Sequence, residues 1–311
     1  ADIRSFKPTY LLGVPRVFEK VYNAASQKAG AGIQGHIFAQ SVKHFVKWSK
    51  DEQAGRGHSF IERMRHSFYM ATVGKSIRSA LGPNLKWLAC GGAPLNVDLA
   101  HFFNGMDDIT FIQGYGMTET AAPFAATRVT DNVIGTVGQP APGSSIRISD
   151  EGELQVKGPN VFRGYHNLPE KTAEAFTADG WLRTGDLAEI DDEGHIVITG
   201  RIKDIIITAG GKNVSPIPLE EEIAKCPIVE HCVVVGDQRP FIGALVTLDP
   251  ESLALWLPAH GLSTETPVDR LATNAAVREE IQQYVDKANA TVSRAESVRK
   301  FAVLDTQFTQ E

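Results

Sequence analysis

The chain has 311 residues, of which 42% are apolar and 22% charged, a balance that argues against a disordered or fibrous protein. The length predicts two domains of roughly 150 residues each. No apolar run approaches the roughly 18 residues of a membrane-spanning helix, and residues 1–10 show no secretory signal pattern. The cysteines Cys90, Cys226 and Cys232 form no Cys-x-x-Cys pair, so zinc and thioredoxin chemistry are not indicated and a reducing, cytoplasmic setting is expected.

The net charge of −6 is unevenly distributed along the chain. Residues 1–86 hold 14 Lys and Arg against 5 Asp and Glu, whereas residues 87–311 hold 17 against 32. The acidic remainder argues against a general nucleic-acid binder. The basic segment has two interpretations. It forms solvated helix faces, or it meets an anionic surface such as the inner face of a membrane, where each Lys or Arg contributes roughly 1 kcal/mol.

Residues 1–86 have the periodicity of amphipathic helices. Apolar residues recur at helical spacing in the stretches 17–25, 33–46 and 61–68. The sequence Gly30-Ala31-Gly32-Ile33-Gln34-Gly35 matches the dinucleotide fingerprint Gly-x-Gly-x-x-Gly, but an amphipathic helix precedes it where that fingerprint requires a strand. We therefore interpret these glycines as a turn between two helices.

Residues 85–128 change to a strand–helix–strand pattern, which predicts a βαβ unit in a mostly parallel sheet. The two apolar runs, residues 85–90 and 109–112, end in Gly91-Gly92-Ala93-Pro94 and Gln113-Gly114-Tyr115-Gly116. Ligands bind beyond the C-terminal ends of parallel strands, where we expect both glycine-bearing segments to form loops.

The rest of the chain reads as two further regions with a domain boundary near residue 201. Residues 129–200 are rich in glycine and proline and contain short β-rich runs, typical of an antiparallel sheet or small barrel: 145–148, 153–156, 187–190 and 196–199. Residues 214–248 predict one helix and two strands, and residues 274–297 predict a final surface helix.

The most informative stretch is Gly114-Tyr115-Gly116-Met117-Thr118-Glu119-Thr120. Its glycines let the backbone turn tightly, while the ring of Tyr115 offers a flat face on which a purine can stack. Thr118 offers a hydroxyl suited to a phosphate oxygen, and Glu119 offers a hard oxygen donor for Mg²⁺. The alternative is a tight turn with a surface aromatic residue and a helix cap.

Three later segments are further candidates, each with a structural alternative. The segment 181–186 ends in a carboxylate, Asp186, which can accept hydrogen bonds from the vicinal hydroxyls of a ribose or can simply occupy a turn. Arg201 and Lys203 are cations that can reach a ribose or phosphate, or are solvated linker charges. Gly210-Gly211-Lys212-Asn213 permits close approach of a ligand, or forms a hairpin turn. The nine histidines are scattered, and we assign none to a metal or a catalytic base.

The order of these segments resembles the adenylate-forming superfamily of acyl-CoA synthetases, luciferases and peptide-synthetase adenylation domains. Five segments carry the resemblance in register: residues 91–95, 114–120, 180–186, 200–204 and 210–216. Gly211-Lys212-Asn213-Val214-Ser215-Pro216 and Val14-Pro15-Arg16-Val17-Phe18-Glu19-Lys20 are most similar to a bacterial long-chain fatty-acid–CoA ligase. The helical stretch 17–80 resembles the helical elaboration of the large domain in that subgroup.

The resemblance implies an α/β fold in two parts. Residues 1–200 would be the C-terminal part of the large AMP-binding domain, helical over 1–86, a βαβ unit over 85–128 and β-rich over 129–200. Residues 201–311 would be an incomplete small α+β lid domain. The family's phosphate loop is expected before residue 1 and its late lysine shortly after residue 311; Lys300 lies too early for that role. The chain is therefore expected to be an internal fragment that is inactive by itself.

The resemblance also implies a two-step ligation. A fatty-acid carboxylate attacks the α-phosphate of ATP to give an acyl-adenylate and pyrophosphate, and the thiol of CoA then displaces AMP. The implied roles are these: Gly91, Gly92 and Ala93 line the adenine on which Tyr115 stacks, Gln113 and Gly114 lie near adenine or the acyl carbonyl, Thr118 holds phosphate, Glu119 binds Mg²⁺, Asp186 takes the ribose hydroxyls with Arg201 nearby, Lys203 is the hinge, and Gly210 and Gly211 face the site during thioester formation.

Two other functions are compatible with the sequence. A fatty acyl-AMP ligase passes its adenylate to a carrier protein, and that subgroup has an insertion near the hinge. Residues 198–208 contain no such insertion, which favours CoA. A non-catalytic nucleotide- or acyl-binding scaffold would suit a chain without the phosphate loop and the late lysine.

Overall fold

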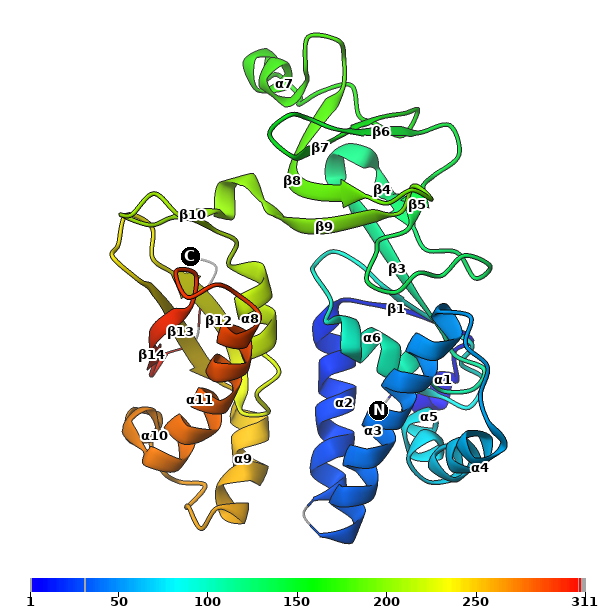
Figure 1. Ribbon diagram of the computed structural model, residues 1–311, viewed down its shortest axis with the longest axis vertical. Coiled ribbons are helices and arrows are strands. Elements are labelled where there is room, and N and C mark those ends of the chain that lie inside the picture. The colour runs from blue at the N-terminus through cyan, green and yellow to red at the C-terminus, as the bar shows by residue number, and fades with distance from the viewer. Residues whose placement is uncertain (1, 31, 307, 309–311) are drawn as a thin grey trace. The chain divides into compact units, whose positions relative to one another are not determined.

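The computed structural model describes residues 2–30, 32–306 and 308, and the chain divides into two units, Ala1–Ile198 and Thr199–Glu311 (Figure 1). The division falls within the strand β9. The helices of the first unit are α1 Asp2–Phe6, α2 Pro15–Ala29, α3 Ile33–Gln53, α4 Phe60–Tyr69, α5 Lys75–Leu81, α6 Val97–Asn104 and α7 Pro169–Ala175. Its strands are β1 Tyr10–Gly13, β2 Trp87–Cys90, β3 Thr110–Met117, β4 Ala122–Ala126, β5 Gln139–Pro140, β6 Ser145–Ile148, β7 Glu153–Lys157, β8 Leu182–Ile190 and β9 Ile196–Arg201.

A five-stranded sheet of order β1-β2-β3-β4-β5 is the centre of the first unit. The strands β1, β2 and β3 run parallel, and α6 connects β2 to β3, so the predicted βαβ unit is present. Two details differ from the expectation. Residues 1–86 are not entirely helical, because β1 pairs with β2. The strand β3 does not end at residue 112, because Gly114–Met117 pair antiparallel with β4.

Aromatic side chains form the core between this sheet and its helices. Five phenylalanines are fully buried there: Phe18, Phe45, Phe102, Phe103 and Phe111. The rings of Phe18 and Phe111 meet edge to face with centroids 5.1 Å apart, a preferred arrangement. Burial of each such side chain contributes roughly 1.5–3 kcal/mol.

The helical segment confirms the predicted turn and the predicted helices, one of which exposes its apolar residues. Gly30 caps the end of α2 and Gly32, with a φ of 83°, caps the start of α3, as expected of a turn between two helices. Ile61, Met64 and Phe68 do lie in a helix, α4, but they are exposed. A π-helical turn, Met70–Gly74, joins α4 to α5. Among the described residues, no helix has the length and apolar character needed to cross a bilayer.

A second sheet, of order β6-β7-β8-β9, follows in the β-rich region. The pairs β6–β7 and β7–β8 are antiparallel, as predicted. The strand β8 begins at Leu182 rather than at residue 187, so Arg183–Asp186 lie in a strand and not in a loop. Leu154, Val156 and Ile196 are fully buried between this sheet and its neighbours.

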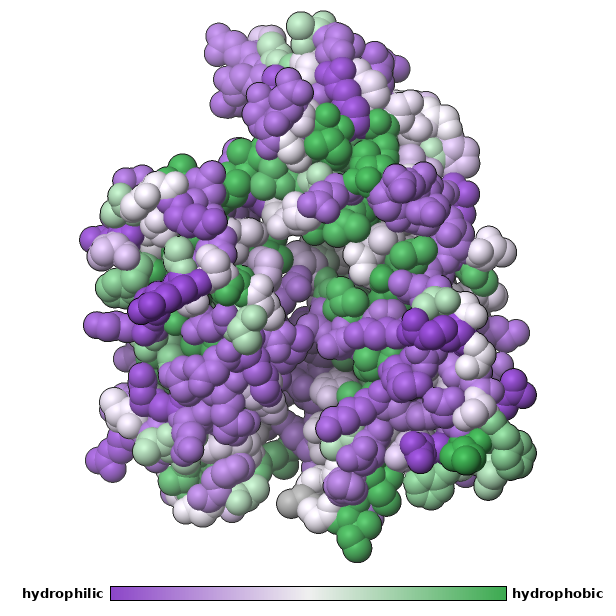
Figure 2. Space-filling model, in the orientation of Figure 1, coloured by the Kyte–Doolittle hydropathy of each residue, from purple (hydrophilic) through white to green (hydrophobic). Residues whose placement is uncertain are grey.

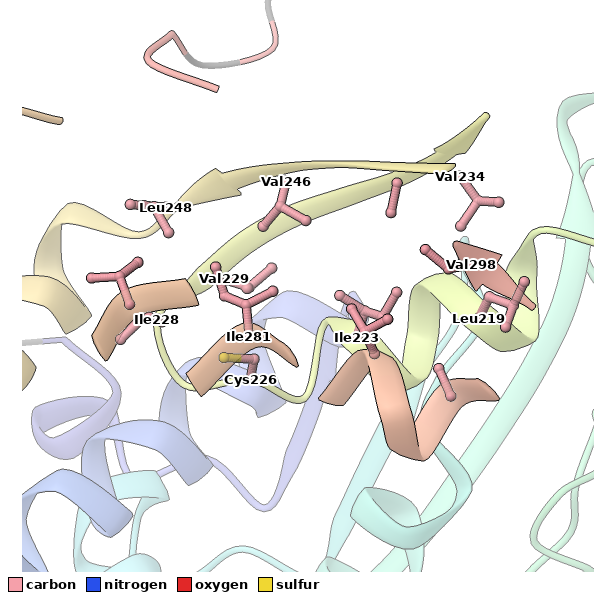
Figure 3. Packing of buried hydrophobic residues seen from close by; sticks show 14 of the residues in the cluster. Leu219, Ile223, Cys226, Ile228, Val229, Val234, Val246, Leu248, Ile281 and Val298 are labelled. Carbon is pink, nitrogen blue, oxygen red and sulfur yellow. The ribbon is translucent and has the colours of Figure 1, made fainter. Parts of the chain in front are cut away.

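The second unit is a three-stranded sheet covered by helices. Its elements are β10 Ile206–Ile207, β11 Asn213–Val214, α8 Ile217–Ile223, β12 Val229–Val235, β13 Ile242–Leu248, α9 Pro250–Ala259, α10 Val268–Thr273, α11 Ala275–Ala290 and β14 Val298–Val303. The sheet order is β12-β13-β14, with β14 parallel to β13. Figure 3 shows Ile223 of α8 and Ile281 of α11 directed at Val246 of the sheet. The predicted final helix ends at Ala290, not at residue 297, because β14 follows.

Candidate functional site

The glycine segments that follow β2 and lie in β3 meet closely. A Cβ atom on Gly91 would lie 3.0 Å from the carbonyl oxygen of Gly114, tighter than ordinary contact. Gly92 has a φ of 84°, a conformation that favours glycine. A side chain at position 91 would therefore force the Gly114 carbonyl to give way slightly, and glycine lets these two predicted site residues meet closely.

The side chain and the backbone N–H of Gln113 both form hydrogen bonds within the first unit. It is 8% exposed, and its Oε1 atom accepts a hydrogen bond of 3.4 Å from the backbone N–H of Gly135. Its own backbone N–H donates to Thr127 Oγ1 at 2.9 Å. Its expected place beside adenine or an acyl carbonyl stays a prediction.

Tyr115 and Asp186 converge although they lie 71 positions apart in the chain. The hydroxyl of Tyr115, in β3, donates a hydrogen bond of 2.6 Å to Asp186 Oδ2, in β8. Asp186 is only 5% exposed. Hydrogen bonds to ionised groups are short and about twice as strong as neutral ones. The aromatic face and the carboxylate that a nucleoside site requires are thus adjacent.

A buried carboxylate that the sequence analysis did not single out supports Asp186. Glu153 of β7 is 5% exposed, and its Oε1 atom accepts a hydrogen bond of 3.1 Å from the backbone N–H of Gly185. Its Oε2 atom lies 3.3 Å from Arg183 Nη1. Gly185 has a φ of 73°, so this bond holds a glycine-dependent irregularity within β8, directly before Asp186. In the sequence, the only indication of this role of Glu153 was a charged residue inside a β-rich run, which is a weak signal.

The turn that follows β3 presents Thr118 and Glu119. Residues 118–120 form a 3-10 turn, in which the buried Thr120 hydroxyl accepts a hydrogen bond of 3.0 Å from the backbone N–H of Met117. Thr118 is exposed and Glu119 is partly buried. Glu119 Oε1 accepts a hydrogen bond of 2.7 Å from the hydroxyl of Tyr165, and this bond raises the pKa of Tyr165.

This arrangement fits Mg²⁺. Glu119 Oε2 has no hydrogen-bond partner among residues 2–30, 32–306 and 308. Mg²⁺ is commonly held by one or two carboxylates together with substrate phosphates and water. One hard carboxylate oxygen beside the exposed hydroxyl of Thr118 meets that requirement. Tyr165, which orients the carboxylate, was missed from the sequence because its partner is 46 positions away.

Four predicted site residues lie in the second unit. Arg201 ends β9 and Lys203 lies in the 3-10 turn Ile202–Asp204, and both are exposed. Gly210 and Gly211 form the turn between β10 and β11, and Gly211 has a φ of 76°. The hairpin interpretation of these glycines is therefore realised, and any further role for them stays a prediction.

One cluster of potential metal ligands serves as a structural clamp. The ligand atoms of Asp191, Glu193 and His195 lie within 4.8 Å of one another. His195, 3% exposed, contacts Asp191 through Nδ1 at 2.9 Å and Asp131 through Nε2 at 3.0 Å. Burial alone would lower the pKa of His195, but the two carboxylates outweigh it and raise that pKa. Since both ring nitrogens are engaged, the histidine joins the β8–β9 connection to residue 131.

Comparison with known proteins gives the same family over both units. The model of the AMP-binding enzyme family matches residues 1–166, and that of the AMP-binding enzyme C-terminal domain matches residues 203–310. FadD15 of Mycobacterium bovis, named a long-chain-fatty-acid–CoA ligase, is 46% identical over 306 residues, which cover 98% of this chain and 50% of the relative. The chain thus spans about half the length of the curated relative.

Solved structures agree on the fold. The adenylation domain of a carboxylate reductase from Mycobacterium chelonae has a TM-score of 0.70 at 23% identity, covering 99% of this chain and 43% of that one. ATP-bound MatB from Rhodopseudomonas palustris has a TM-score of 0.54 at 30% identity, covering 73% and 43% respectively. The α/β fold class and the family resemblance expected from the sequence are confirmed.

Proposed function

The chain belongs to the AMP-binding enzyme family, and from this premise we propose that it forms part of a long-chain fatty-acid–CoA ligase, an AMP-forming acid–thiol ligase. The name of the 46% identical mycobacterial relative supports the reaction class. The single observation that carries the proposal is the 2.6 Å hydrogen bond between Tyr115 and Asp186, because it brings together two residue types that a nucleoside needs.

In the first half-reaction, the residues of the first unit bind and orient ATP. The Tyr115 ring stacks on adenine, with Gly91, Gly92 and Ala93 along its edge and Gln113 and Gly114 nearby. Asp186 accepts hydrogen bonds from the ribose hydroxyls. These contacts hold the α-phosphate where a fatty-acid carboxylate attacks it, and pyrophosphate leaves.

The turn after β3 handles the phosphates. The Thr118 hydroxyl donates to a phosphate oxygen, and Glu119, whose Oε1 atom accepts the hydrogen bond from Tyr165, would hold Mg²⁺. When bound, Mg²⁺ offsets the negative charge that develops on the phosphates in the transition state. ATP in the related MatB structure supports nucleotide use by this fold.

In the second half-reaction, the small C-terminal domain, residues 201–311, reorients about Lys203. Arg201 accompanies the ribose, and Gly210 and Gly211 face the site while the CoA thiol attacks the acyl carbonyl and AMP leaves. Such domain movements let one pocket serve two chemistries. The direct path from β9 through residues 202–205 to β10, without an insertion, favours CoA over a carrier protein as the acceptor.

Two assays test the proposal. We expect the 311-residue chain to bind AMP weakly in calorimetry and to catalyse no fatty-acid-dependent ATP–pyrophosphate exchange. The product of the complete open reading frame should form acyl-CoA from a long-chain fatty acid, ATP and CoA. Robust exchange by the 311-residue chain contradicts the expected inactivity. A complete product that ignores CoA and loads only a carrier protein supports the acyl-AMP ligase, and one without either activity supports the scaffold.

A further inference from the structure

The connection between β3 and β4 contains a strained residue. Residues 118–121 join the two antiparallel strands as a tight turn, and Ala121 closes it in the left-handed conformation, with a φ of 53° and a ψ of 46°. Asp108 and Asn167 also have a positive φ, but their short polar side chains can stabilise it locally. Ala121 has no such group. Its conformation therefore persists only where the surrounding structure enforces it.

A distant segment of the chain, residues 158–165, binds this turn. It lies between β7 and α7, and the structure, which describes all of it, shows neither helix nor strand there. Asn160 Nδ2 donates a hydrogen bond of 3.2 Å to the carbonyl oxygen of Thr120. The backbone N–H of Phe162 donates one of 2.7 Å to the carbonyl oxygen of Glu119. Segment 158–165 thus binds two adjacent carbonyl groups of the turn.

Segment 158–165 is itself fixed to the β-rich region. Ser144 Oγ donates a hydrogen bond of 3.2 Å to Asn160 Oδ1. The ring of Phe162 stacks on that of Phe176 with centroids 5.7 Å apart, against the buried core of the second sheet. The next helix, α7, has no buried residue among its seven, all of which the structure describes. Figure 2 shows mostly hydrophilic side chains at the top of the view, where Figure 1 places α7. The contacts of the segment itself therefore hold it in place.

The carbonyl groups of the turn all accept hydrogen bonds from the protein. The Thr118 carbonyl accepts one of 3.1 Å from the backbone N–H of Ala121, and segment 158–165 supplies the donors for Glu119 and Thr120. Carbonyl oxygens are the negative ends of the peptide groups and repel a phosphate, so protein donors on them reduce this repulsion. Thr118 keeps an exposed side chain. The segment therefore favours both the shape and the charge distribution that a phosphate-binding turn needs.

We propose that Asn160 is a positioning residue for the phosphate-binding turn, which its hydrogen bond to Thr120 holds in the left-handed closure at Ala121. The inference rests on the proposed function, in which Thr118 and Glu119 act on ATP and Mg²⁺. Strain of this kind is retained at functional sites when neighbouring contacts over-determine the backbone. Without the Asn160 donor, the turn relaxes toward an unstrained backbone, and the Thr118 hydroxyl and the Glu119 carboxylate leave the positions that ATP and Mg²⁺ require.

Substitutions in the complete open-reading-frame product test this role. Asn160→Leu keeps the approximate size of the side chain and removes the donor. Asn160→Leu combined with Ala121→Gly tests the strain, because glycine adopts a positive φ without steric cost. Asn84→Leu is the matched control, since Asn84 is exposed and its side chain has no hydrogen bond within the described part of the chain. Fatty-acid-dependent ATP–pyrophosphate exchange is titrated with ATP, Mg²⁺ and fatty acid, and circular dichroism establishes that each variant is folded.

We expect Asn160→Leu to raise the KM for ATP and the Mg²⁺ requirement about 3- to 10-fold, with the KM for fatty acid within about twofold of the wild type. The added glycine should recover most of this change, and Asn84→Leu should match the wild type. Unchanged ATP and Mg²⁺ titrations overturn the proposal. So does an equal loss toward every substrate, or a glycine variant that recovers nothing, since either indicates a purely structural contact. A complete product without exchange activity overturns the proposed function and this inference with it, whereas unchanged titrations in an active enzyme overturn the inference alone.

Discussion

Replacing Tyr115 by phenylalanine separates the two tasks of this side chain. The phenyl ring keeps a flat face for a purine, while the 2.6 Å hydrogen bond to Asp186 is lost. Asp186 is 5% exposed, so this hydrogen bond is largely shielded from water. A hydrogen bond to a charged group contributes about 1.5–3 kcal/mol, so we expect the free energy of unfolding of the first unit to fall by that amount.

The two measurable consequences of Tyr115 substitution differ in size. For a unit of 198 residues, each kcal/mol lowers the melting temperature by about 2–4 °C, which gives a decrease of roughly 3–12 °C for Tyr115→Phe. Its AMP affinity should stay within about threefold of the wild type because the stack remains. Tyr115→Ala loses the stack as well, worth about 1–3 kcal/mol per base, so its AMP affinity should fall about 5- to 150-fold.

Thermal unfolding followed by circular dichroism and AMP calorimetry measure these effects. Tyr10→Phe is the matched control, because Tyr10 is 51% exposed and its hydroxyl has no hydrogen bond within the described part of the chain. Its stability should change by less than about 0.5 kcal/mol. A Tyr115→Phe protein that melts with the wild type, or a Tyr115→Ala protein that binds AMP equally well, refutes the reasoning.

Three further substitutions test individual contacts. Tyr165→Phe removes the donor to Glu119, so adenylate formation by the complete protein should need about threefold more Mg²⁺, with AMP binding unchanged in Mg²⁺-free buffer; an unaltered Mg²⁺ titration contradicts this role. Glu153→Ala leaves a backbone donor before Asp186 unpaired and should cost about 1–3 kcal/mol of stability in urea unfolding, while Glu153→Gln, which keeps an acceptor, should recover most of it and of the AMP affinity. Folding raises the pKa of His195 above 6.5. Its charged form therefore stabilises the protein below pH 6.5, and that contribution disappears as the pH rises through the folded-state pKa. His195→Gln should destabilise the protein more at pH 6 than at pH 9, and equal losses of stability at both pH values would count against the clamp.

Local sequence signals predicted much of the molecule. Apolar periodicity located α2, α3 and α6, because a helix side repeats within a few residues of itself. The glycines at 30 and 32 predicted a turn because an amphipathic helix, and not a strand, precedes them in the chain. The candidate residues in segments 114–120 and 181–186 were identified from side-chain chemistry alone, which needs no knowledge of the partner.

Pairing between distant segments decided the details that were missed. The strand β1 has only four residues, and they form a strand because they pair with β2. The glycines of β3 interrupt the apolar pattern, and their antiparallel partner β4 keeps the segment extended. Glu153 and Tyr165 acquire their roles from partners that lie 32 and 46 positions away.

The amino-acid sequence by itself thus determined most element types from short-range propensity, the chemical character of the site from residue identity, and the family from the order of its motifs. Only the tertiary structure decided that Tyr115 and Asp186 meet, that Glu153 holds Gly185 beside Asp186, and that the apolar side of α4 faces outward. Periodicity establishes that a helix has two sides, but which side is buried depends on the free energy of contacts with the rest of the chain.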